Sequence, residues 1–154
     1  MEMKSEQACL PNLIIRKFRI EDYDALIALW NEAKLRYKPK GRDRRDNIES
    51  ELKQSNATFL VAEKDGKLVG SIFGTHDGRK GWINRLTVSP AYRRQGIAAK
   101  LMREVETWLY NMGIGIIACL IEDWNEMSMK VFERLGYTRH SDIIYFTKRG
   151  NPDI

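Results

Sequence analysis

Hydrophobic and polar positions alternate with a period of two in several parts of the chain, as in strands with one buried face. Residues 12–19 suit an opening strand, and residues 58–62, 68–74 and 82–88 predict a three-stranded meander because turn residues separate them. The run 116–121 is apolar without alternation, which is typical of a strand covered on both faces. These patterns predict a sheet built from an opening strand, a meander and a buried strand.

A period near 3.6 residues indicates four helices between these strands. The first is expected over residues 21–35 and a second, weaker one over residues 44–54. The strongest lies between Pro90 and Gly113, where one apolar stripe continues along its length. A fourth is expected over residues 125–136, where an asparagine is suited to cap its start.

The order of these elements indicates the fold class. A last strand at residues 143–147 completes the series of strand, two helices, three meander strands, helix, strand, helix and strand. Such an order predicts an α/β fold in which a mixed sheet carries helices on both faces. With 154 residues, 43% of them hydrophobic, the chain is long enough for one core and short for two, so we expect a single domain over residues 1–154.

The composition also bears on location. No apolar run approaches the roughly 20 residues needed to span a bilayer, and residues 1–11 alternate charged and polar residues where a signal peptide would be hydrophobic. The sequence therefore favours a cytoplasmic protein without a membrane partner. Cys9 and Cys119 are far apart, so neither a disulfide framework nor a metal site is expected. The sequence leaves a homodimer open.

Positive charge is concentrated in one stretch. The formal net charge is +5, which attracts nucleic acids, phosphorylated ligands and acidic partners alike. We call residues 34–45 the basic connection, because they join the first two expected helices. They form a candidate contact surface that contains Lys34, Arg36, Lys38, Lys40, Arg42, Arg44 and Arg45.

A short motif precedes the strongest helix and follows a strand. Backbone N–H groups in the first turn of a helix have no partner and lie at the positive end of the helix dipole, so they can hold an anion. Gly96 lets the backbone approach an oxygen without an intervening side chain, and Ala98 keeps the next turn low. A phosphate-binding loop is therefore expected at Arg93, Arg94, Gln95, Gly96, Ile97 and Ala98.

This motif resembles the signature of the GNAT superfamily, the general-control-related N-acetyltransferases. In that family an Arg or Gln is followed after two residues by Gly and, one residue later, by Gly or Ala. Arg93, Gly96 and Ala98 match this pattern. Residues 83–90 also resemble the family's central strand and its exit, and residues 125–137 resemble its last core helix.

The resemblance in element order covers about residues 12–148 and implies a three-layer αβα fold with a splayed, mostly antiparallel central sheet. It also implies an N-acetyltransferase that uses acetyl-CoA, or another acyl form of coenzyme A, and an amine acceptor. In such proteins the pantetheine arm pairs like an extra strand with the central strand, and loop amides hold the pyrophosphate. From the residues alone, Asn125 suits a plain helix cap equally well. The implied cofactor-binding residues are Leu86, Thr87, Val88, Arg93, Arg94, Gln95, Gly96, Ile97, Ala98, Asn125 and Ser128.

The catalytic positions depart from the family pattern. Attack of an amine on a thioester needs a neutral amine, stabilisation of the oxyanion and often a proton for the thiolate. Family members often carry a glutamate base at one of two positions, and in this chain those positions are Asn84 and Leu120. Phe132 stands at the position where the family frequently has a tyrosine acid. Glu122, next to Asp123, is the carboxylate nearest to the expected reaction centre, so we expect it to act as a base through water. Two solvated carboxylates in a turn are an equal alternative.

Three functions remain open from the sequence. An N-acyltransferase that acts on a small molecule or a protein amino group is expected first. The catalytic positions that cannot ionise favour an acyl-CoA sensor, and the basic connection favours a nucleic-acid binder, although no recognition motif accompanies it. In proteins that resemble this one, the basic connection would border the acceptor mouth and favour an acidic or zwitterionic acceptor. Contact of these charges with the cofactor's adenosine phosphates or with solvent is the alternative.

Overall fold

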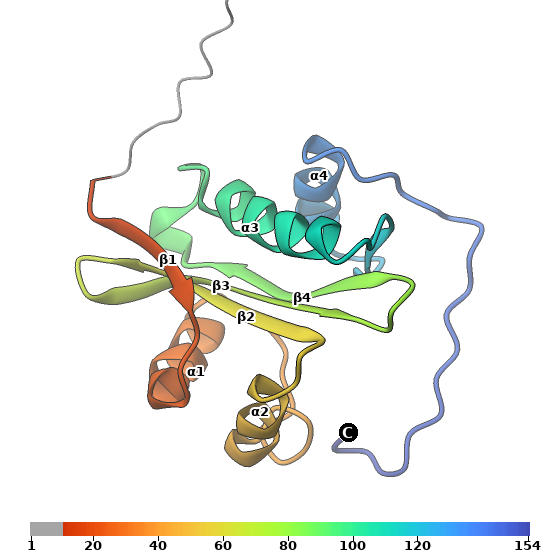
Figure 1. Ribbon diagram of the computed structural model, residues 1–154, viewed down its shortest axis with the longest axis horizontal. Helices are drawn as coiled ribbons and strands as arrows, with labels where there is room; N and C mark the ends of the chain where they lie inside the picture. Colours follow the sequence, from red (N-terminus) through yellow and green to blue (C-terminus); the bar gives the residue numbers. More distant parts are fainter. Residues whose placement is uncertain (1–10) are drawn as a thin grey trace, which may run out of the picture.

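The computed structural model describes residues 11–154, in which a five-stranded sheet lies between two layers of helices (Figure 1). The expectations for Cys9 and for most of the first eleven residues lie outside this range. Neighbouring strands are antiparallel except for the last pair, which is parallel. This confirms the expected mixed, mostly antiparallel sheet. The strands lie in sequence order: β1 (Leu13–Lys17), β2 (Ala57–Lys64), β3 (Lys67–His76), β4 (Gly81–Val88) and β5 (Ile117–Cys119).

The helices cover both faces of the sheet, as expected. One layer contains α1 and α2, and the other contains α3 with α4 beside it (Figure 1). α1 ends before residue 35 because Lys34 adopts a φ of 57°, in the left-handed region that stops a helix. The helices are α1 (Tyr23–Glu32), α2 (Arg45–Leu52), α3 (Ile97–Asn111) and α4 (Glu126–Arg134), with short 3-10 turns at Ile20–Asp22 and Pro90–Tyr92.

Close packing of α3 on the sheet fixes the position of its N-terminus. Leu101, Val105 and Leu109 are fully buried against the strands. A Cβ atom placed on Gly74 of β3 would lie 2.5 Å from Cγ1 of Val105, so only glycine permits this approach. On the other face, the indole N–H of Trp30 donates to Oγ of Ser71 at 3.1 Å. Both helix layers are therefore packed closely against the middle strands.

Two expectations about strands are wrong. The run 116–121 forms strand only at Ile117–Cys119, and Leu120 is 56% exposed, because β5 is an edge strand that pairs with β4 alone among the described residues. Residues 143–147 form no strand. Among the described residues no backbone hydrogen bond joins them to the sheet, since the chain beyond α4 runs outside the body towards α2 (Figure 1).

Within residues 11–154, no helix combines the length and the apolar character needed to cross a membrane.

Candidate functional site

The sheet opens at the middle of β4. Its register with β5 covers only the first three residues of β4, from Gly81 to Ile83. Beyond this point Arg85 has a φ of 56°, and the pairing of β3 with β4 shifts by a residue, which is a β-bulge. Residues 84–88 therefore have no strand partner on the side of β5 among the described residues. An unpaired strand edge of this kind can accept an extended ligand as an added strand.

The N-terminus of α3 lies at the end of this opening. Gly96 is its N-cap with a φ of 79°, and no side chain caps the helix. Nothing lies within 4 Å of the position that a Cβ atom on Gly96 would take. Arg94 also has a positive φ, of 62°, which turns the loop sharply before the helix. The first-turn amides are thus open, as an anion site at a helix N-terminus requires.

Of the polar atoms in the loop and in the adjoining end of β4, one has a partner within the fold and two buried ones have none. The Nε–H of Arg93 donates to the carbonyl oxygen of Val88 at 3.3 Å, which ties the loop to β4. Oε1 of Gln95 and Oγ1 of Thr87 are buried, and neither has a hydrogen-bond partner. Buried polar atoms without partners are rare in folded proteins. Both atoms belong to residues expected to bind the cofactor.

Asn125 and Ser128 lie together at the start of α4. Oδ1 of Asn125 accepts a hydrogen bond from the backbone N–H of Ser128 at 3.2 Å. The helix-cap interpretation of Asn125 is therefore confirmed. A cofactor contact of either residue remains a prediction.

The positions that carry acids and bases in the family differ in burial. Asn84 and Leu120 are exposed, whereas Phe132 is 8% exposed and packs in the core, as expected for a residue without a chemical role. Its ring meets that of Tyr137 edge to face, with centroids 5.3 Å apart. Burial raises the pKa of Tyr137 well above the usual range and leaves its hydroxyl unpaired. Glu122 is exposed after β5.

The basic connection is anchored by one buried carboxylate. Oδ2 of Asp43 accepts the backbone N–H of Lys38 at 2.6 Å and a guanidinium N–H of Arg85 at 2.5 Å. The guanidinium of Arg85 also lies 5.3 Å above the Trp30 ring and donates to the carbonyl oxygen of Arg36. The connection is therefore fixed to the bulge of β4.

Sequence reasoning missed this anchor. Neither Asp43, which lies within a run of cations, nor Arg85, which lies within an expected strand, is singled out by the sequence patterns. The isolated acid within the basic connection was the one available signal, because a carboxylate there can pair with a cation from another element.

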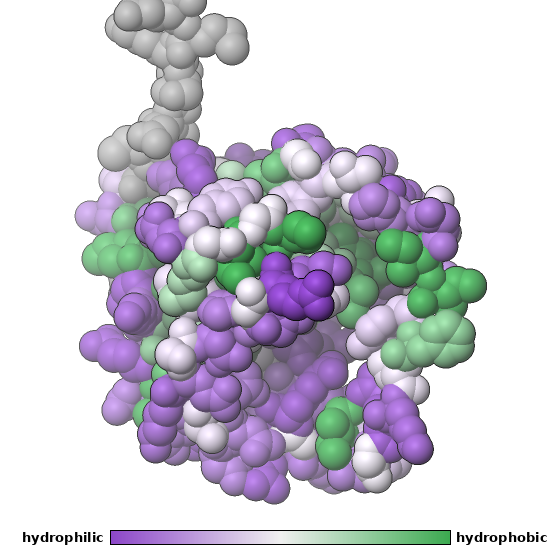
Figure 2. Space-filling view, turned by 45° about the vertical axis from the view of Figure 1, so that its right-hand side comes forward, coloured by the Kyte–Doolittle hydropathy of each residue, from purple (hydrophilic) through white to green (hydrophobic). Residues whose placement is uncertain are grey.

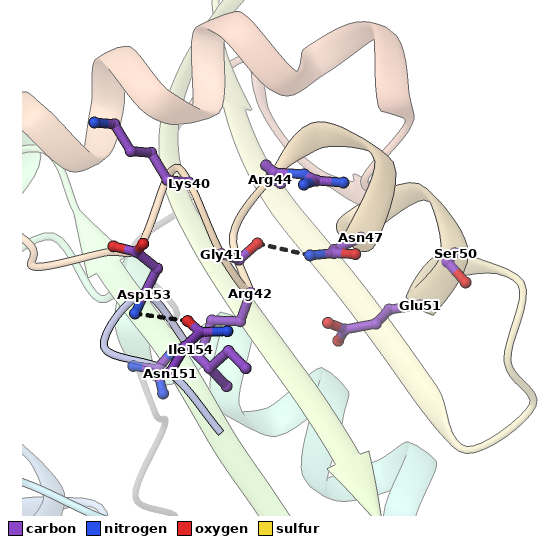
Figure 3. A pocket seen from close by; sticks show the side chains of 10 residues that line it. All are labelled: Lys40, Gly41, Arg42, Arg44, Asn47, Ser50, Glu51, Asn151, Asp153 and Ile154. Carbon is purple, nitrogen blue, oxygen red and sulfur yellow. Dashed lines mark hydrogen bonds between the residues drawn. The ribbon is translucent and has the colours of Figure 1, made fainter. Parts of the chain in front are cut away.

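A cleft of about 600 Å³ lies between the basic connection, α2 and the C-terminal end of the chain (Figure 3). Lys40, Arg42 and Arg44 contribute to its lining, and Glu51 of α2 points into it (Figure 3). Burial raises the pKa of Glu51, nearby Asp43 adds to that rise, and Arg85 opposes it. The cleft thus combines cations with two carboxylates, those of Glu51 and Asp153. Within residues 11–154, no cluster of three or more potential metal-ligating side chains exists.

Solved structures with the same fold include three N-acetyltransferases. The aminoglycoside N-acetyltransferase AAC(6')-Iy in complex with CoA is 22% identical, with a TM-score of 0.73 over 89% of this chain and 95% of its own. PaiA N-acetyltransferase from Thermoplasma acidophilum in complex with coenzyme A is 22% identical, with a TM-score of 0.71 over 79% and 87% of the two chains. Glucosamine-6-phosphate N-acetyltransferase from Arabidopsis thaliana is 18% identical, with a TM-score of 0.72 over 90% and 99%.

The sequence itself matches a family model. The match covers residues 23–137, from the first residue of α1 to the tyrosine that follows α4, and it includes the open loop before α3. The model is that of the acetyltransferase (GNAT) family, and this chain belongs to that family.

Proposed function

We propose that this chain is an N-acetyltransferase that transfers an acetyl group from acetyl-CoA to an amine, with the pyrophosphate of CoA held by residues 93–98. The observation that carries this proposal is the uncapped N-terminus of α3, where Gly96 leaves the backbone amides open. Membership of the GNAT family supports the same reaction. The complexes of AAC(6')-Iy and PaiA with CoA support the same cofactor.

The opening beside β4 supports a path for the rest of the cofactor. The pantetheine arm would pair with the free edge of β4 at Leu86 and Val88, and the buried oxygens of Thr87 and Gln95 would gain partners there. Asn125 and Ser128 would line the opposite side. The arm would thereby lie between the two strands that separate.

The reaction joins the acceptor nitrogen to the thioester carbonyl carbon, breaks the carbon–sulfur bond and leaves the thiolate to take a proton. We propose that Glu122 accepts the amine proton through water, because it follows β5 at the open end of the sheet. Orientation of the two substrates supplies acceleration that needs no dedicated acid. The buried, aromatic Phe132 takes no part in proton transfer.

The cleft beside the basic connection supports a zwitterionic or acidic acceptor. Arg42 and Arg44 would attract its carboxylate or phosphate, and Glu51 would attract its ammonium group. A small amino-acid-like amine has both charges.

Release of free thiol from acetyl-CoA, followed over time with a panel of amines, tests the transferase proposal. Turnover with at least one amine is expected. Tight binding of acetyl-CoA without thiol release would favour the alternative, an acyl-CoA sensor, which the absence of ionisable groups at Asn84, Leu120 and Phe132 supports. Tight binding of nucleic acid that weakens steeply with salt would favour the third function.

A charge reversal tests the acceptor assignment. Arg42→Glu, Arg44→Glu and Arg45→Glu together should raise the KM for the acceptor and leave that for acetyl-CoA nearly unchanged. The matched control reverses three exposed arginines elsewhere, Arg79, Arg103 and Arg134, with the same change in net charge. If only the KM for acetyl-CoA changed, the basic connection would contact the cofactor and not the acceptor.

A further inference from the structure

The bulge of β4 contains a strained residue. The pairing of β3 with β4 shifts between Ser71 and Phe73, so β4 carries one extra residue there. Arg85 lies in this bulge with a φ of 56°. Residues other than glycine adopt such a conformation at a cost in energy, and they keep it only where the surrounding structure fixes them. Contacts outside the strand ladder are therefore needed to hold Arg85.

Two hydrogen bonds in series hold the main chain of Arg85. Its carbonyl oxygen accepts the hydroxyl of Ser71 at 2.9 Å, and Oγ of Ser71 accepts the indole N–H of Trp30 at 3.1 Å. Because this hydroxyl donates to one group and accepts from the other, it has one orientation. The carbonyl oxygen of Arg85 is therefore held on the side of the sheet that α1 covers.

The side chain of Arg85 is held from the same side. Its guanidinium lies 5.3 Å from the centre of the Trp30 ring, and it donates to Asp43 and to the carbonyl oxygen of Arg36. Trp30 thus acts on Arg85 twice, through Ser71 on the main chain and through its ring on the side chain. The strained residue is fixed by α1 and by the basic connection that follows it.

These contacts are unusual for their burial. The side of α1 and α2, in the lower part of Figure 2, has a largely hydrophilic surface, whereas Ser71 and Trp30 are fully buried beneath it. Four polar residues are buried within residues 11–154, and two of them, Asp43 and Ser71, bind Arg85. Buried polar groups that are fully paired make the structure around them rigid. The buried polar groups of this layer are thus concentrated on the bulge.

The bulge lies where the reacting end of the cofactor would be. If the pyrophosphate lies at residues 93–98, a pantetheine arm that runs back along Val88 and Leu86 brings its sulfur atom to residues 84–85. The last pair that joins β4 to β5 is Ile83 with Cys119, directly before the bulge. The conformation of Arg85 therefore sets the course of β4 at the point where the thioester would lie.

From these contacts we infer that Ser71 and Trp30 are positioning residues, which hold the bulge of β4 in the conformation that places the thioester of a bound acyl-CoA. This role rests on the proposed function, from which it takes the path of the cofactor along β4. Both residues act through the main chain of Arg85. The residues proposed to hold the pyrophosphate, 93–98, form no part of this series of bonds. Its loss should therefore displace the reacting end of the cofactor and leave the pyrophosphate in place.

Hydrogen exchange of the backbone amides, resolved by residue in NMR spectra, tests this role without any transfer reaction. Acetyl-CoA should slow exchange at residues 84–88 of the wild type. In Ser71→Ala the slowing should persist at residues 87–88 and be lost at residues 84–86. The matched control is Ile48→Val, which shortens a buried side chain in the same apolar cluster as Trp30 and should behave like the wild type. Slowing at residues 84–86 that survives in Ser71→Ala would overturn the inference.

Kinetics with an amine that the wild type accepts give a second test. Ser71→Ala should lower kcat about tenfold and leave the KM for acetyl-CoA nearly unchanged, because a small displacement of the thioester misaligns it with the amine. Rates are normalised to the number of CoA-binding sites found by calorimetric titration, so that unfolded protein does not count. An unchanged kcat in Ser71→Ala would contradict the positioning role.

A double variant tests whether the two residues act together. Trp30→Phe removes the indole N–H and keeps an aromatic ring. Combined with Ser71→Ala, it should lower kcat no further than Ser71→Ala alone, because the two groups act in series. Losses of kcat that multiply would show that the residues act separately. If the wild type releases no thiol with any amine, the transferase proposal fails, and the exchange experiment alone then decides the positioning role.

Discussion

The basic connection, residues 34–45, and the C-terminal segment, residues 138–154, differ in composition and in how firmly each is held to the fold. The more polar of the two is the one that is held by buried contacts. The first is dense in cations, yet it is fixed to β4 through buried Asp43 and to α1 through the hydroxyl of Tyr23, which donates to the carbonyl oxygen of Asp43. The second contains a strongly apolar stretch, yet its side chains at 143–146 are exposed. A single carboxylate with two well-placed donors orders a polar segment. Apolar side chains order a segment only when a complementary surface is present.

The largest effect is expected when the anchor of the basic connection is removed. Asp43→Ala leaves the guanidinium of Arg85, whose side chain is only 15% exposed, without its carboxylate. Breaking a buried ion pair by removing one partner costs about 3 kcal/mol of the free energy of unfolding. Urea denaturation of the two proteins measures this change.

The matched control for that substitution is Asp46→Ala. Asp46 also pairs with an arginine, Arg44, but both side chains are more than half exposed. Exposed pairs of this kind contribute little to the free energy of unfolding, because water and salt screen them. Equal losses of unfolding free energy in the two variants would show that Asp43 does not anchor the basic connection. That result would contradict the difference in attachment between the basic connection and the C-terminal segment.

The smallest effect concerns Glu51, which lies next to the anchor. Its pKa is raised above the ordinary 4.5, chiefly by burial, so the folded chain binds this proton more tightly than the unfolded chain does. The stability from this proton is fully present below about pH 4.5 and is lost as the pH rises through the folded-state pKa. Glu51→Gln should therefore match the wild type near pH 4 and be slightly more stable near pH 7.

Denaturation at the two pH values measures that difference, with Glu49→Gln on the exposed side of α2 as the control. A Glu51→Gln variant that gains nothing between pH 4 and pH 7 would mean that this carboxylate is not penalised by burial, and its place in the cleft would need another explanation.

The sequence allowed good prediction wherever one residue type meets a local requirement. Gly96 before a long amphipathic stripe predicts an open helix start, and the structure has it with a positive φ. Asn125 predicts a cap, and its side chain makes the capping hydrogen bond. Both features depend on neighbours within one turn, so a single sequence contains the relevant information.

Features that depend on distant partners were not predictable in this way. The pairing of Asp43 with Arg85 joins residues 42 positions apart, and nothing local distinguishes this acid from its neighbours. Residues 143–147 have the composition of a strand, but composition does not say whether a strand will meet a sheet edge, or which one. The catalytic group is equally undetermined by sequence, because the customary positions carry Asn84, Leu120 and Phe132.

Calorimetric titration with acetyl-CoA tests the central claim, that the open start of α3 binds the cofactor's pyrophosphate. Gly96→Glu places a carboxylate where the anion would lie, and Gly78→Glu is the matched control, since Gly78 has a similar φ of 86° and equally open surroundings in a distant turn. We predict binding by the wild type and by Gly78→Glu, and loss of measurable binding by Gly96→Glu with its thermal unfolding still cooperative. Unchanged affinity in the Gly96→Glu variant would contradict the assignment of this site.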